Sequence, residues 1–140
     1  MQPQALTQYI WQDIRKEVYA DKIQLYLPFF FGSDRDEPLC LTWDRNGVLS
    51  DGGRTMTELK KRIPDITPYL ESIRNIISTY GLITLVGGQN LTVQHYRTHT
   101  YLGETYLDYW DGLEFLLRVI SQISVVDTIT VDEDGTVRLL

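Results

Sequence analysis

The chain has 140 residues, of which 43% are hydrophobic and 23% are charged, and this length and composition predict a single soluble domain over residues 1–140. Thirteen Lys and Arg against nineteen Asp and Glu give a formal net charge of −6, which disfavours direct binding to nucleic acid or to an anionic membrane. No apolar run approaches the roughly 18 residues that cross a bilayer, and Cys40 is the only cysteine. We therefore expect a cytoplasmic protein without disulfides.

The first third of the chain predicts one helix and then three strands. Apolar residues at three- and four-residue steps predict an amphipathic helix over about residues 3–19. The alternating segment "KIQLYLPFFF" predicts a strand, in which Pro28 favours an edge position or a bulge because proline has no N–H to donate. "PLCLTWD", the turn Arg45–Gly47 and the returning "VLS" predict a hairpin.

The rest of the chain predicts three more helices and two hairpins. The helices are expected over about residues 55–63, 67–80 and 113–125, and Thr55 and Glu58 have the spacing of a capping box. "LITLV" and "LTVQHY" flank the turn "GGQN" and predict a hairpin, whereas "TITVDEDGTVRLL" predicts a hairpin or one strand and a tail. The segment "YLGETYLDYWDG" is ambiguous. These elements predict an α+β fold, with a mostly antiparallel sheet built from hairpins and about four helices packed on it.

The order of these features resembles a known family. "IQLYLPFFF" precedes "LCLTWDRNGVLSDGGRTMTELKKR", and the helical stretches "YLESIRNIISTYGL" and "GLEFLLRVISQISVVD" follow. Together they resemble the bacterial and phage family called domain of unknown function 1828, over about residues 5–127. The resemblance implies a small intracellular protein of bacteria or their phages. It transfers no catalytic residue, and Gly52 stands where the turn of the family has its second acidic residue.

The turn "DGGR" before the helix at 55–63 is one candidate site. Its backbone N–H groups and the positive end of the helix could bind an anion with Arg54, and Asp51 with Glu58 is similar to the carboxylates that hold Mg²⁺ in nucleases. A plain strand-to-helix turn, which adjacent glycines make at the least conformational cost, is the favoured explanation of this stretch. A small metal- or phosphate-dependent enzyme that uses Asp51, Arg54 and Glu58 is therefore the alternative hypothesis.

The two histidines do not predict a metal site. His95 and His99 are four residues apart, which is a metal-binding spacing on a helix. "QHYRTHT" is instead typical of a strand and loop, where residues four apart lie about 13 Å from one another. We expect no metal and no cofactor. Whether the protein is an enzyme stays open, with a non-enzyme favoured.

An aromatic and acidic segment is the leading candidate for a binding surface. Tyrosine and tryptophan rings beside carboxylates suit protein recognition, because rigid amphipathic rings supply contact area; the same rings could instead cap one end of the core. The leading hypothesis is a non-enzymatic protein-binding or regulatory module that prefers a basic partner surface. In a phage it could inhibit a host nucleic-acid-binding protein by occupying its nucleic-acid groove. The residues of this surface are Tyr101, Glu104, Tyr106, Asp108, Tyr109, Trp110 and Asp111.

Overall fold

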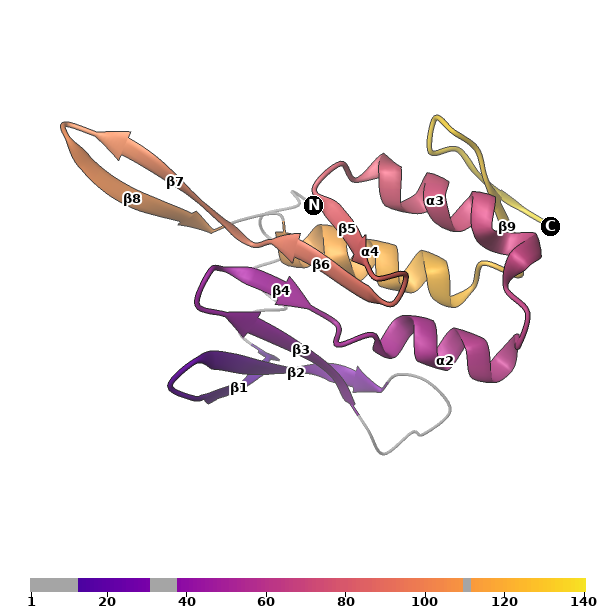
Figure 1. Ribbon diagram of the computed structural model, residues 1–140, viewed down its shortest axis with the longest axis horizontal. Coiled ribbons are helices and arrows are strands. Elements are labelled where there is room, and N and C mark those ends of the chain that lie inside the picture. The colour runs from indigo at the N-terminus through magenta and orange to yellow at the C-terminus, as the bar shows by residue number, and fades with distance from the viewer. Residues whose placement is uncertain (1–12, 31–37, 110–111) are drawn as a thin grey trace.

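The computed structural model describes residues 13–30, 38–109 and 112–140, with the backbone alone at 29–30, 96–99 and 106–109. These residues form an α+β fold whose main sheet has six strands in the order β1-β2-β3-β4-β6-β5, every neighbouring pair antiparallel (Figure 1). The strands are β1 (Arg15–Val18), β2 (Lys22–Phe30), β3 (Pro38–Asp44), β4 (Val48–Ser50), β5 (Ile83–Val86) and β6 (Asn90–Gln94). The expected fold class and antiparallel sheet are confirmed.

Three α-helices pack with this sheet into one core. They are α2 (Arg54–Arg62), α3 (Leu70–Thr79), which follows the short 3-10 helix η1 (Thr67–Tyr69), and α4 (Gly112–Ser124). Alternate strand residues such as Leu25, Leu41 and Leu49 meet helix residues such as Leu116 and Ile123 in a cluster from which solvent is excluded. Burying each such side chain stabilises the fold by about 1.5 to 3 kcal/mol. Within the described ranges no helix is long and apolar enough to cross a membrane.

The helix expected over residues 3–19 is wrong at its C-terminal end. Arg15–Val18 is a strand that pairs with β2, with Val18 opposite Ile23. Ladder hydrogen bonds and cross-strand contacts outweigh the helical spacing here. One of these contacts places the Arg15 guanidinium 4.0 Å from the ring centroid of Tyr26. Residues 3–12 of the expected helix lie outside the described residues. The described residues contain three α-helices, whereas the sequence predicted about four for the whole chain.

Pro28 marks a bulge in an interior strand. The register between β2 and β3 shifts between Tyr26 and Phe30. On its other side β2 pairs with β1 only over residues 23–26. A proline is tolerated at this place because the ladder is already interrupted there.

Two smaller hairpins complete the described fold. The first joins β7 (Tyr96–Tyr101) to β8 (Glu104–Tyr109), and the second joins β9 (Ile129–Val131) to β10 (Val137–Leu139). We call residues 96–109 the arm, because this two-stranded ribbon extends away from the main sheet and the helices (Figure 1). The ambiguous segment of the sequence is thus mostly strand, and of the two alternatives for the C-terminal segment the hairpin is the one that forms.

Candidate functional site

The Asp51 carboxylate is buried between β4 and α2. Asp51 is 3% exposed, and its Oδ1 accepts hydrogen bonds from the backbone N–H groups of Gly53 at 2.8 Å and Leu91 at 3.0 Å. Its Oδ2 accepts from the N–H of Thr55 at 3.2 Å. Asp51 therefore caps α2 and joins it to β6. Since backbone donors use both oxygens, the carboxylate is poorly placed to hold a metal ion.

The expected capping box between Thr55 and Glu58 is not formed. Gly53 is the N-cap residue, with φ 79°, and as a glycine it has no side chain of its own to cap the helix. Thr55 is 1% exposed, and its Oγ1 has no hydrogen-bond partner among the described residues. The cap comes from Asp51 because the two glycines, both with positive φ, turn the chain so that this carboxylate lies over the first helical turn.

Arg54 and Glu58 form an ion pair on the surface of α2. Arg54 Nε lies 3.8 Å from Glu58 Oε1, and Lys61 Nζ lies 3.2 Å from the same oxygen. Of the three candidate residues in this turn, the structure thus brings two together through their side chains, while the third binds backbone. In the described part of the chain no group of three His, Cys, Asp or Glu side chains gathers as metal ligands would.

The tip of the arm carries an exposed apolar residue in a strained conformation. Leu102 and Gly103 form the two-residue loop with φ angles of 52° and 81°, the positive values that a type I′ turn requires. Leu102 is the only non-glycine residue with positive φ in the described ranges. Its side chain is 86% exposed, beside Tyr101 at 64%. A left-handed conformation costs an ordinary residue about 1 to 2 kcal/mol, so the fold alone gives no reason for leucine here.

The candidate binding surface maps onto the arm. The register pairs Tyr101 with Glu104, which flank the tip and are both exposed. Tyr106, Asp108 and Tyr109 lie in β8, where the structure describes only their backbone. The last two predicted residues, Trp110 and Asp111, lie outside the described residues.

The root of the arm is held to α4 by His95. This residue lies between β6 and β7, is 4% exposed and accepts a hydrogen bond at Nδ1 from the backbone N–H of Leu113 at 3.0 Å. Its ring meets the ring of Trp43 edge to face, with centroids 5.2 Å apart. A Cβ on Gly112 would lie 2.7 Å from the His95 Cα, so helix and arm root touch closely. Burial lowers the pKa of His95 from 6.5 to about 4.

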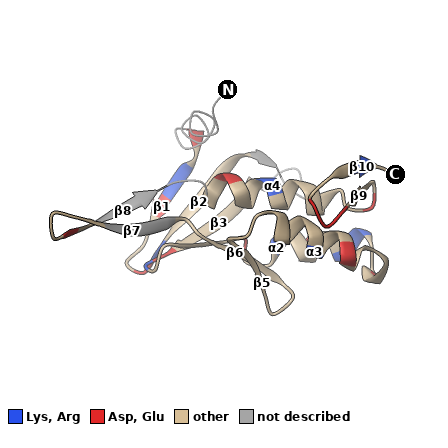
Figure 2. Cartoon of the chain, turned by 90° about the horizontal axis from the view of Figure 1, so that it is seen from above, with Lys and Arg blue, Asp and Glu red and all other residues tan. Residues whose placement is uncertain are grey.

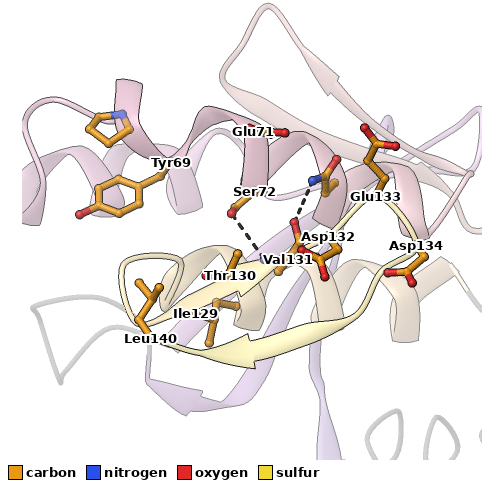
Figure 3. A pocket seen from close by; sticks show the side chains of 12 residues that line it. Tyr69, Glu71, Ser72, Ile129, Thr130, Val131, Asp132, Glu133, Asp134 and Leu140 are labelled. Carbon is orange, nitrogen blue, oxygen red and sulfur yellow. Dashed lines mark hydrogen bonds between the residues drawn. The ribbon is translucent and has the colours of Figure 1, made fainter.

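A polar groove lies between the start of α3 and the β9–β10 hairpin (Figure 3), with a volume of about 760 Å³. Asn75 on α3 holds the hairpin by donating from Nδ2 to the Val131 carbonyl at 2.8 Å. No lysine or arginine lines the groove, whereas four carboxylates do, three of them in the β9–β10 turn (Figure 2). A groove lined in this way attracts cations. The four carboxylates belong to Glu71, Asp132, Glu133 and Asp134.

Sequence reasoning missed both His95 and the groove. The signal for His95 was present, because Leu91 and Val93 occupy the core face of β6 and the period of two places residue 95 on that same face. The groove had no local signal, since it joins segments about 60 residues apart that only the tertiary fold brings together.

Comparisons of the chain with family models, with curated proteins and with solved structures find no match. The resemblance to domain of unknown function 1828 stays a prediction.

Proposed function

We propose that this protein is a non-enzymatic binding module that recognises another protein through the tip of its arm. The observation that carries the proposal is Leu102, which is strained and 86% exposed. Asparagine or glycine would make the same turn with less strain. A large apolar side chain exposed at such a place, next to an exposed tyrosine, offers contact area that a partner's pocket can bury.

The isolation of the arm supports the same proposal. Among the described residues no third strand pairs with β7 or β8. A two-stranded ribbon is at most marginally stable in water when it stands alone. A partner that packs on the ribbon would supply the missing contact area.

The partner we propose is a protein with a basic surface. The chain has a net charge of −6, and a charge of this sign attracts a basic surface at long range. Electrostatic attraction of this kind speeds association and selects partners more than it adds affinity.

The enzyme hypothesis has less support. It needs Asp51, Arg54 and Glu58 to act on one ligand. The Asp51 oxygens accept three backbone hydrogen bonds, and Glu58 lies beside two cationic side chains. These contacts account for both carboxylates in structural terms.

Capture from a bacterial lysate tests the proposal. Leu102 and Leu139 are both 86% exposed, so Leu102→Asn and Leu139→Asn remove the same apolar group from two different places. Immobilised wild type and Leu139→Asn should retain a common partner that Leu102→Asn releases, with all three proteins equally folded by circular dichroism. If Leu102→Asn keeps every protein that the wild type keeps, the arm tip is not the binding surface.

A further inference from the structure

The arm root is joined to α4 by a contact that needs a neutral histidine. Nδ1 of His95 accepts the hydrogen bond from Leu113 N–H, so the ring proton of the neutral form lies on Nε2. A proton added at Nδ1 would face that N–H with a second donor. It would also place a positive charge at the positive end of α4. Protonation therefore turns this attraction into a repulsion.

The contact leaves no room for a compromise geometry. The ideal Cβ position on Gly112 is 2.7 Å from the His95 Cα and 2.8 Å from the Gln94 carbonyl oxygen. The backbone N–H of His95 also donates to the Gly47 carbonyl at 2.9 Å. A charged ring can be accommodated only if the first turn of α4 and the arm root separate.

We propose that protonation of His95 releases the root of the arm from α4, so that acidification loosens the arm. The consequence for binding rests on the proposed function, because the arm is the surface proposed there. A loosened arm would lose more conformational freedom when it binds, so its affinity for a partner would fall.

The other charged groups on the packed elements are already engaged. On α4, Glu114 is 3% exposed and pairs with Arg118 at 2.6 Å. On the β3–β4 hairpin, Asp44 accepts hydrogen bonds from two backbone N–H groups of its turn, and Arg45 donates to the Ala20 carbonyl. Among the described residues that pack here, His95 is therefore the group placed to gain a proton on mild acidification.

The direction and size of the effect follow from proton linkage. The buried ring has a pKa of about 4, whereas a released ring regains the ordinary value near 6.5. The released state thus binds more protons between these two values, and acidification across this range favours release. Lowering the pH from 7.5 to 5 should raise the released fraction roughly 15- to 30-fold.

Amide hydrogen exchange of the isolated full chain tests this inference without any partner. The protection factor of the Leu113 amide, corrected for the intrinsic pH dependence of exchange, should fall roughly 15- to 30-fold between pH 7.5 and pH 5. His95→Asn should abolish this change, because asparagine can offer an oxygen close to the place of Nδ1 and does not titrate. His99→Asn removes the other histidine of the chain and should keep the change.

The release must also be local. The amide of Leu25, in the centre of the sheet, should stay at least about tenfold better protected than that of Leu113 at both pH values. Equal protection of the two amides, or a pH response that persists in His95→Asn, would overturn the inference. If His95→Asn does not fold, an NMR titration of the wild-type ring decides: a midpoint near 6.5 with an unchanged Leu113 amide excludes the mechanism.

Because no partner enters these measurements, they separate the two proposals. A failed lysate experiment leaves the pH response of Leu113 intact, and a missing pH response leaves the arm tip as the binding surface.

Discussion

The Asp51 carboxylate accepts a hydrogen bond from the backbone N–H of Leu91, 40 residues later in the chain, at 3.0 Å. The same carboxylate also accepts from Gly53 and Thr55. One buried side chain therefore joins the strand before α2, the first turn of α2 and the start of β6. Without it, three backbone donors lose their acceptor inside the protein.

We expect Asp51→Ala to lower the free energy of unfolding by about 3 kcal/mol or more, because a buried donor without an acceptor costs about 1 to 3 kcal/mol. Urea denaturation measures the loss as a lower midpoint at an unchanged slope. Asp65→Ala is the control, since Asp65 is exposed and accepts from the N–H of Thr67 at 3.0 Å, and it should cost clearly less than Asp51→Ala. Equal losses in the two variants would contradict the capping role.

The close contact of Gly112 with His95 gives a second prediction. Gly112→Ala places a methyl group 2.7 Å from the His95 Cα, so the start of α4 must move, and we expect a loss of about 2 kcal/mol in the free energy of unfolding. Gly81→Ala is the matched control, because nothing lies within 4 Å of its Cβ position. Thermal unfolding compares the two variants. A Gly112→Ala protein as stable as Gly81→Ala would mean that the arm root and α4 are not in close contact.

Much of the fold could be predicted from local sequence patterns. Helices with a regular apolar period, such as α2 and α4, begin and end within a residue or two of the expected positions. Arg15–Val18 could not be assigned in this way, because its apolar spacing is helical but the segment pairs with β2 as a strand. The local spacing of apolar residues does not report secondary structure that depends on pairing with another strand.

The roles of single residues were harder to predict than the elements. Thr55 and Glu58 have the spacing of a capping box, yet Asp51 caps the helix from before the Gly-Gly turn. The turn of the arm was not predicted because Leu102 occupies a position where a type I′ loop usually has asparagine, aspartate or glycine. In both cases the backbone angles of the turn, which sequence spacing does not report, decided the outcome.

The strain at Leu102 predicts a variant with a more stable arm and weaker partner binding. Leu102→Asn should stabilise the arm by about 1 kcal/mol, because asparagine tolerates a positive φ and suits the first loop position of a type I′ turn. Protection of the Glu104 amide against exchange should rise accordingly. The same variant should lose the partner that Leu139→Asn retains. A Leu102→Asn protein with an unchanged or less protected arm would show that residue 102 is not strained.

The ion pair between Arg62 and Asp127 gives a prediction about pH. Arg62 Nη1 lies 2.6 Å from Asp127 Oδ2, and Arg62 Nη2 donates to the Ser124 carbonyl at 2.6 Å. The hydrogen bond from Arg62 lowers the pKa of Asp127 below its ordinary value of 3.8. The unfolded chain therefore binds a proton at Asp127 before the folded protein does. The stabilisation is complete well above pH 3.8 and is lost as the pH falls through the lowered pKa.

We expect Arg62→Met, which keeps the apolar stem and removes the charge, to cost about 1 kcal/mol at pH 7 after allowance for solvent screening. The cost should shrink as the pH falls through the lowered pKa of Asp127, because the protonated carboxyl no longer pairs with Arg62 and only the bond to the Ser124 carbonyl remains to be lost. Urea denaturation at pH 7 and at pH 2.5 measures both values. Arg138→Met breaks a more exposed pair, in which Arg138 lies 2.9 Å from Asp132, and should cost less than about 0.5 kcal/mol at either pH. A cost for Arg62→Met that is the same at both pH values would assign its contribution to the carbonyl contact and not to the carboxylate.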